Sequence, residues 1–233
     1  MSSRYWAIIA AAGGGSRMRA ATPKQYLKAG GRALIEHSID AFLKLKWIEG
    51  IVVVLPKDDH AFAKLPLSRD PRVHVATGGA ARADSVLAGL KQIAELAGVD
   101  PTHVLVHDAA RPCVTRTDIE RLRDEASDEN GGLLAVPIAD TVKRGDDARV
   151  KETVDRRELW AAQTPQMFRL DLLRSALEDA AARGAEITDE AAAMEAQSHR
   201  PRLVQGRKSN IKVTFPEDLA LAAFWLARKE SER

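Results

Sequence analysis

A short apolar run, residues 5–12, leads without a break into three glycines, Gly13, Gly14 and Gly15. Such runs, when they contain β-branched residues, are typical of buried strands in parallel sheets. Glycines at a strand end permit a tight turn and let backbone N–H groups approach a ligand, and a concave row of such donors suits phosphate oxygens. Arg17 and Lys24 add two positive charges to the same stretch. The segment therefore predicts a buried strand followed by a loop that binds a polyphosphate.

The glycine loop differs from two common phosphate-binding motifs. The P-loop requires Gly-Lys-Ser or Gly-Lys-Thr, and neither tripeptide occurs in this chain. The dinucleotide fingerprint also fails, because Met18 stands where its third glycine would be. The sequence thus indicates a phosphate loop of another kind, whose basic residues follow the glycines.

Strand-like and helix-like segments alternate along most of the chain. Strands are expected at 51–55, 73–76, 104–108, 132–136 and 202–205. Helices are expected at 34–43, 170–182 and 188–197, and another carries apolar residues of 86–94 on one face. Two more are expected to begin at Thr117, with a capping box to Glu120, and near Pro216. This alternation implies an α/β fold, a Rossmann-like, mostly parallel sheet covered by helices. Ligands bind beyond the carboxyl ends of such strands, so the glycine loop and Asp108 are expected at the same edge.

Residues 138–157 interrupt the alternation. Two polar strands, 141–144 and 150–154, are expected around a turn at Gly145, Asp146 and Asp147. A lone two-stranded hairpin is marginally stable in water, and this one is too polar to form a core. We hypothesise that the chain is a single domain, residues 1–233, with 138–157 as a protruding arm exchanged between the subunits of a homodimer. The alternative is a solvated hairpin that lies on its own domain.

The composition excludes several classes of protein. The net charge is +2, with 35 basic and 33 acidic residues, so nothing calls for a nucleic-acid partner or an anionic membrane. The first apolar run is too short to span a bilayer and lacks the basic flank of a signal peptide. Cys113 is the single cysteine, which excludes a disulfide within the chain and favours a reducing compartment. A cytoplasmic location is expected.

The residues that could carry chemistry are one carboxylate and several cations. Asp108 ends the expected strand 104–108, where it could hold Mg²⁺ opposite the phosphate loop or cap a turn. Histidines and Cys113 show no zinc-ligand spacing. Transfer of a phosphoryl group requires in-line positioning and compensation of charge on its oxygens, which cations supply. The sequence therefore favours nucleotidyl transfer. The candidate cations are Arg17, Lys24, Arg111, Arg156 and Lys212.

Eight segments, in order, carry a resemblance to a known family. They are residues 11–18, 23–27, 82–86, 107–112, 153–156, 163–166, 187–190 and 210–214. From residue 5 to about residue 225, the chain resembles the 2-C-methyl-D-erythritol 4-phosphate cytidylyltransferases. The resemblance implies a fold of the nucleotide-diphospho-sugar transferase type. It also implies transfer of CMP from CTP to methylerythritol phosphate with Mg²⁺ or another divalent cation, in non-mevalonate isoprenoid synthesis.

The resemblance also implies roles for individual residues. Arg17 and Lys24 would stabilise the transition state, and Lys212 and Arg156 would position the incoming phosphate, so these four are the expected catalytic residues. Asp108 would contact Mg²⁺ and substrate. The expected substrate-binding residues are Ala11, Ala12, Gly13, Gly14, Gly15, Gly79, Ala80, Ser85, Asp108, Arg111, Thr141, Thr164 and Thr188.

Two features leave alternatives open. Relatives often carry an acidic residue where this chain has Ala80, in the region that reads the pyrimidine, so base selectivity depends on whether a side chain or the backbone makes that contact. The phosphate-binding cations would also serve another polyol phosphate, such as ribitol 5-phosphate. A protein that binds CTP without turning it over is the alternative from another functional class.

Overall fold

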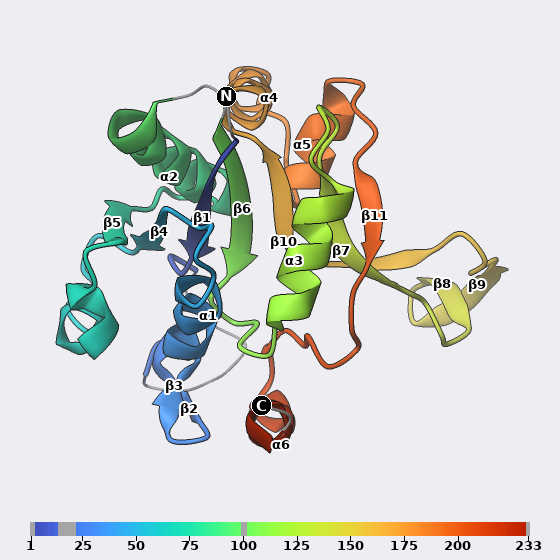
Figure 1. Ribbon diagram of the computed structural model, residues 1–233. Coiled ribbons are helices and arrows are strands. Elements are labelled where there is room, and N and C mark those ends of the chain that lie inside the picture. The colour runs from blue at the N-terminus through green and yellow to red at the C-terminus, as the bar shows by residue number, and fades with distance from the viewer. Residues whose placement is uncertain (1–2, 14–21, 99–101, 232–233) are drawn as a thin grey trace.

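The computed structural model describes residues 3–13, 22–98 and 102–231 (Figure 1). The first apolar run forms strand β1 (Arg4–Ala10) at the middle of the sheet. Its side chains alternate between two cores, with Ala7 and Ile9 on one face and Trp6 and Ile8 on the other. The predicted buried strand is confirmed, and both of its faces are covered.

The described residues form one large sheet of seven strands in the order β11-β7-β10-β6-β1-β4-β5. The bounds are β4 (Gly50–Leu55), β5 (Val73–Thr77), β6 (Thr102–Asp108), β7 (Gly132–Pro137), β10 (Trp160–Arg169) and β11 (Arg202–Gln205). Strands β1, β4, β5 and β6 pair in parallel, as do β7 and β11, and β10 runs antiparallel between β6 and β7. The predicted mostly parallel sheet is confirmed.

Helices cover both faces of this sheet (Figure 1). One core contains α1 (Leu34–Leu43) and α3 (Arg116–Glu125), and the other contains α2 (Arg82–Ala97), α4 (Leu170–Ala182) and α5 (Glu190–Ala196). Helix α6 (Pro216–Ser231) packs on a third, smaller core next to β2 (Lys28–Ala29) and β3 (Arg32–Ala33). Short helical turns occur at η2 (Lys24–Tyr26), η3 (Phe62–Lys64) and η4 (Pro66–Arg69). None of the helices within the described ranges is long and apolar enough to cross a membrane.

Strand β10 was not predicted. Its middle, Gln163, Thr164, Pro165 and Gln166, interrupts the apolar pattern by which a buried strand is recognised. The pairing with β7 shifts register between Ala162 and Gln166, an irregularity of the kind at which proline is tolerated inside a sheet. The polar side chains of Gln163, Thr164 and Gln166 are nevertheless buried, and hydrogen bonds to other segments satisfy them.

Two predicted helix starts were wrong. Helix α3 begins at Arg116, and its N-cap is Thr115, whose Oγ1 accepts a hydrogen bond from the backbone N of Asp118, so the expected capping box from Thr117 does not form. Helix α5 begins at Glu190, two residues after the expected start, because the side chain of Asp189 accepts from the backbone N of Ala192. In both helices a side-chain cap sets the first turn.

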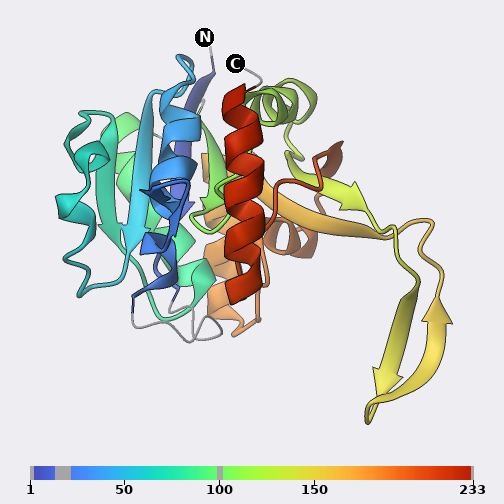
Figure 2. The same cartoon turned by 90° about the horizontal axis from the view of Figure 1, so that it is seen from below.

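The polar hairpin is present and projects from the rest of the chain (Figure 2). It pairs β8 (Val142–Asp146) with β9 (Arg149–Val154), and nearly all its side chains are exposed. The turn lies at Asp147 and Ala148, with φ of 44° and 58°, so it overlaps the expected turn at 145–147 only at Asp147. Positive φ at both positions is typical of a type I′ turn, a two-residue hairpin loop whose twist matches that of its strands.

Candidate active site

A pocket of about 300 Å³ opens where β1 and β6 end. Segments from five parts of the chain line it, as expected at the carboxyl edge of a parallel sheet. The lining residues are Ala10, Ala11, Ala12, Gly13, Lys24, Gln25, Gly79, Ala80, Ala81, Arg82, Ser85, Asp108, Ala109, Ala110, Lys212 and Thr214. The prediction that the glycine-loop segment and Asp108 lie at the same edge of the sheet is confirmed for the part of that segment that the structure describes.

One wall of the pocket is a close contact between backbone segments. A Cβ on Gly78 would lie 2.5 Å from the Cβ of Ala12 and 2.8 Å from Oγ of Ser85, so no side chain fits there. The Ser85 hydroxyl accepts a hydrogen bond from Gly79 N (3.2 Å) and donates to Ala81 O (3.1 Å). Ser85 therefore shapes the turn that faces the pocket, and its predicted place in the site is consistent with this position.

Lys24 reaches the pocket from η2, which is held on both sides. The side chain of Gln25 is buried, and its Nε2 donates to the carbonyl of Ala11 over 3.1 Å. The Tyr26 hydroxyl donates to Oδ2 of Asp59 over 2.7 Å. These bonds tie Lys24 to the end of β1 and to the loop after β4. Both anchors lie in segment 23–27, which carries the family resemblance, but their partners could not be predicted because the contacts join distant segments.

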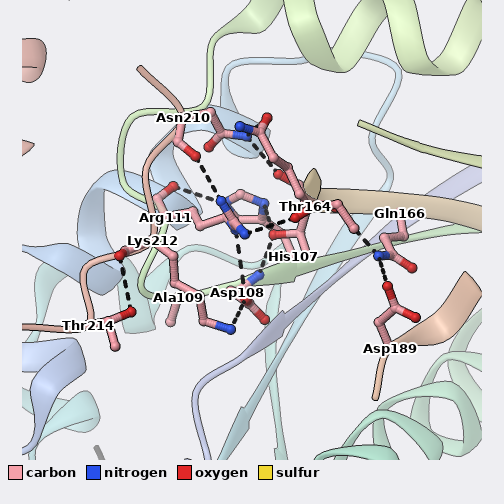
Figure 3. A network of polar contacts seen from close by, with 12 residues as sticks. His107, Asp108, Ala109, Arg111, Thr164, Gln166, Asp189, Asn210, Lys212 and Thr214 are labelled. Atoms are coloured by element: carbon pink, nitrogen blue, oxygen red, sulfur yellow. Dashed lines mark hydrogen bonds and ion pairs between the residues drawn. The ribbon is translucent and has the colours of Figure 1, made fainter. Parts of the chain in front are cut away.

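Asp108 is surrounded by the positive charges of Arg82, Arg111 and Lys212. Figure 3 shows Arg111 and Lys212 beside it. Its Oδ2 lies 2.7 Å from Nζ of Lys212 and 3.8 Å from Nε of Arg111, while its Oδ1 accepts from Arg82 at 3.2 and 3.3 Å. Burial alone would raise the pKa of Asp108, but the charges of Arg82, Lys212 and Arg111 outweigh it and hold that pKa well below its ordinary value. The carboxylate is therefore ionised across the physiological range.

Sequence reasoning missed Arg82 and Glu190, which meet behind Asp108. Nη1 and Nη2 of Arg82 donate to the two carboxylate oxygens of Glu190, over 2.5 and 3.1 Å. Burial raises the pKa of Glu190 above its ordinary value, and the charge of Arg82 opposes that rise. Both residues lie in segments that carry the family resemblance, 82–86 and 187–190, but neither was given a role, because an isolated Arg or Glu in a helical segment usually belongs to a solvated face.

Arg111 and Thr164 support the pocket without lining it. Nη1 of Arg111 donates to the carbonyl of Asn210 (2.8 Å), and Nδ2 of the buried Asn210 donates to the carbonyl of Thr164 (2.9 Å). The Thr164 hydroxyl accepts from the backbone N of Asp108 (3.0 Å) (Figure 3). These bonds join β6, β10 and the segment that carries Lys212. Asn210 is a further positioning residue that the prediction lacked.

The remaining predicted residues do not meet at this pocket. Thr141 and Arg156 lie at the base of the hairpin, where Arg156 donates a hydrogen bond to the carbonyl of Ala139. Thr188 is exposed just before α5. Gly14, Gly15 and Arg17 lie outside the described residues.

The donor set for a metal is small. No cluster of three or more His, Cys, Asp or Glu able to hold a metal ion occurs within residues 3–13, 22–98 and 102–231. Asp108 is the carboxylate that lines the pocket. Mg²⁺ is commonly held by one or two carboxylates together with substrate phosphates, so Asp108 fits a metal that arrives with a nucleotide.

The sheet, the backbone wall and the facing charges define an α/β protein of the nucleotidyltransferase type. The model of one family, 2-C-methyl-D-erythritol 4-phosphate cytidylyltransferase, matches residues 5–228. The chain belongs to this family.

Individual relatives agree with the family assignment. A protein of that name from Ectopseudomonas mendocina (strain ymp) is 51% identical over 235 residues, which cover 100% of this chain and 98% of the relative. A crystal structure described as 4-diphosphocytidyl-2C-methyl-D-erythritol synthase is 37% identical, with a TM-score of 0.84 and coverage of 97% and 100%. The Francisella tularensis 2-C-methyl-D-erythritol 4-phosphate cytidylyltransferase is 33% identical, with a TM-score of 0.83 and coverage of 95% and 99%.

Proposed function

We propose that the protein transfers CMP from CTP to 2-C-methyl-D-erythritol 4-phosphate, in non-mevalonate isoprenoid synthesis. The observation that carries this proposal is the match of the family over residues 5–228, in a chain whose pocket brings together Lys24, Lys212 and Asp108. A phosphate oxygen of the polyol phosphate attacks the α-phosphorus of CTP. The bond from that phosphorus to the bridging oxygen breaks, giving 4-diphosphocytidyl-2-C-methyl-D-erythritol and pyrophosphate.

The described residues supply binding and charge for this reaction. The backbone of Ala11, Ala12 and Gly13 and the ammonium group of Lys24 face the space in which the triphosphate would lie. Charge develops on the phosphate oxygens in the transition state, and fixed cations are most effective there because they do not have to reorganise. Lys212 holds the incoming phosphate beside Asp108, and the turn at Gly79 and Ser85 receives the base. Arg17, outside the described residues, is proposed to act with Lys24.

We also propose Mg²⁺ as the metal of the reaction, held by Asp108 together with phosphate oxygens of CTP. When bound, it supplies positive charge to those oxygens. Oδ2 of Asp108 is the oxygen that Lys212 contacts at 2.7 Å, so ligand binding requires Lys212 to move from Oδ2 toward the incoming phosphate.

The protein is further proposed to act as a homodimer with exchanged arms. Thr141 and Arg156 belong to the projecting hairpin and do not line the pocket of their own chain. Arg156 nevertheless belongs to the set of cations expected to bind the polyol phosphate. A hairpin that reaches into the partner's pocket would resolve this disagreement and would cover polar strands that have no core of their own.

Pyrophosphate release tests the function directly. The purified protein is mixed with CTP, Mg²⁺ and either methylerythritol phosphate or ribitol 5-phosphate. Release with methylerythritol phosphate alone is expected. Release with ribitol 5-phosphate alone would support cytidylyl transfer but would show that methylerythritol phosphate is not the substrate. Binding of CTP with no release from either mixture would support a non-catalytic CTP-binding protein.

A further inference from the structure

Glu190 is a buried carboxylate that does not line the pocket but contacts one of its walls. Its side chain is 1% exposed, and its two oxygens accept from Nη1 and Nη2 of Arg82. The same guanidinium donates from Nε and Nη2 to one oxygen of Asp108, Oδ1. Arg82 therefore bridges two carboxylates, one behind the pocket and one in it.

The backbone around Glu190 is fixed independently of Arg82. Oε1 of the buried Gln166, on β10, accepts from the backbone N of Ala191 (2.8 Å). Nε2 of Gln166 donates to Oδ2 of Asp189 (2.9 Å), whose other oxygen caps the first turn of α5 (Figure 3). Because Gln166 of the sheet binds both neighbours of Glu190 along the chain, the backbone of Glu190 is fixed where its side chain contacts Arg82.

The pattern of the bonds shows where Arg82 is held, because it contacts both oxygens of Glu190 but one oxygen of Asp108. Its contacts with Glu190 are 2.5 and 3.1 Å, whereas both contacts with Asp108 are longer, 3.2 and 3.3 Å, and reach only Oδ1. An arginine fork beside a carboxylate normally binds both oxygens. Arg82 does not reach the second oxygen of Asp108, Oδ2, which lies 2.7 Å from Nζ of Lys212 and 3.8 Å from Nε of Arg111.

We propose that Glu190 is a positioning residue that confines Arg82 to Oδ1 of Asp108 and so keeps Oδ2 available to the pocket. Without the negative charge of Glu190, Arg82 shifts toward Asp108 and pairs with both oxygens. Oδ2 is then covered by an arginine that cannot be displaced as readily as Lys212. The consequence for the reaction rests on the proposed function, in which Oδ2 serves the metal and the incoming phosphate.

The test compares Glu190→Gln with Glu190→Asp and Arg82→Lys, each assayed for pyrophosphate release and for thermal unfolding. Glu190→Gln keeps the shape and removes the charge, and is expected to lower kcat about 10–100-fold, the usual effect of losing a residue that orients a ligand. Glu190→Asp keeps the charge and should recover part of that loss. Arg82→Lys is also expected to lower kcat, since a lysine cannot serve two carboxylates as a fork.

Asp118→Asn is the matched control. Asp118 is another buried carboxylate paired with arginine, at Arg207 and Arg121, and it does not line the pocket. Its loss should lower the melting temperature as Glu190→Gln does, but leave kcat of the folded protein within about twofold of the unaltered protein. An equal fall of kcat in Asp118→Asn, or an unchanged kcat in Glu190→Gln, would show that Glu190 acts only on stability.

A crystal structure of Glu190→Gln gives a readout that does not depend on activity. Arg82 in contact with both oxygens of Asp108 is the expected result, and an Arg82 that still reaches Oδ1 alone would overturn the inference. If the unaltered protein releases no pyrophosphate from CTP with either polyol phosphate, the proposed function fails. The crystal structure of Glu190→Gln still decides whether Glu190 positions Arg82.

Discussion

Lys24 lines the pocket on a segment that Gln25 and Tyr26 fix to β1 and to the loop after β4, so its backbone is in place before substrate binds. We expect Lys24→Ala to lower kcat about 10²–10³-fold, the usual effect of removing one preorganised group that stabilises transition-state charge. CTP affinity should change far less, because the charge is most useful when the transition state forms.

Steady-state kinetics and CTP titration separate these two effects. Lys28→Ala is the control, since Lys28 is an exposed lysine of the same segment outside the pocket. A variant that loses CTP affinity and keeps its kcat would contradict a transition-state role for Lys24.

Ala80 lines the pocket beside the turn expected to receive the base. An acidic side chain there could accept a hydrogen bond from the exocyclic amino group of cytosine, which uracil lacks. We expect Ala80→Asp to raise the preference for CTP over UTP, in kcat/KM, by about tenfold, equivalent to roughly 1.4 kcal/mol. An unchanged ratio would mean that the backbone of the turn already reads the base.

The start of α3 can be tested through its cap. The Thr115 hydroxyl accepts from Asp118 N and donates to Oδ2 of Asp118, over 2.6 Å. Thr115→Ala should lower the free energy of unfolding by about 1 kcal/mol, as for other N-cap threonines. Thr117→Ala, at an exposed position in the first turn of the same helix, is the control and should have little effect. Urea unfolding curves measure both free energies. A larger loss of stability in Thr117→Ala than in Thr115→Ala would show that Thr117 is the cap, as the sequence predicts.

Strands β1 and β6 meet at a buried histidine whose pKa should affect stability in acid. His103 stacks on Tyr5, with ring centroids 5.3 Å apart. Burial lowers the pKa of His103, the charge of Arg169 adds to this, and Ser127 and Asp171 only partly oppose it. Below pH 6.5 the unfolded chain then takes up a proton that the folded chain does not. The free energy of unfolding therefore decreases as the pH is lowered.

His103→Phe keeps a ring at this position and removes the titration. Between pH 7.5 and pH 5, its free energy of unfolding should fall less than that of the unaltered protein, by at most about 2 kcal/mol. Urea unfolding at the two pH values measures the difference, and His60→Gln, at an exposed histidine, should retain the full loss. If the free energy of unfolding of His103→Phe fell as much as that of the unaltered protein, other groups would be responsible for the acid sensitivity.

The elements that could be predicted from sequence are those with a local cause. Strands β1, β4 and β6 contain apolar runs because both of their faces are buried, and Asp108 could be placed at the ligand edge because it ends one of them. Strand β10 has buried polar residues whose partners lie on other segments, so its pattern did not mark it as a strand. Arg82 and Glu190 are 108 residues apart, and only the packing of α2 beside α5 and β6 reveals their contact.

The whole molecule is proposed to be a dimer in which each pocket uses the arm of the other chain, and this can be tested by complementation. Lys24 lines the pocket, whereas Arg156 lies two residues after β9, at the base of the hairpin. Figure 2 shows that this hairpin projects from the rest of the chain. In a heterodimer of a Lys24→Ala chain and an Arg156→Ala chain, exchanged arms give one pocket with both residues and one with neither. A purified heterodimer should then show about half the activity of the unaltered dimer, since one of its two symmetric sites is complete.

The two homodimers provide the baseline for this experiment, because each lacks one residue in both sites. Arg157→Ala is the control for the arm itself, since Arg157 is the exposed neighbour of Arg156 and pairs with Asp155. A heterodimer of Arg157→Ala and Lys24→Ala chains should also retain about half of the activity, because its complete site needs only Arg156 from the arm. If the arm instead served its own chain, every site in the Lys24→Ala and Arg156→Ala heterodimer would lack one residue. No recovery in that heterodimer, or a protein that sediments as a monomer at micromolar concentration, would therefore exclude arm exchange.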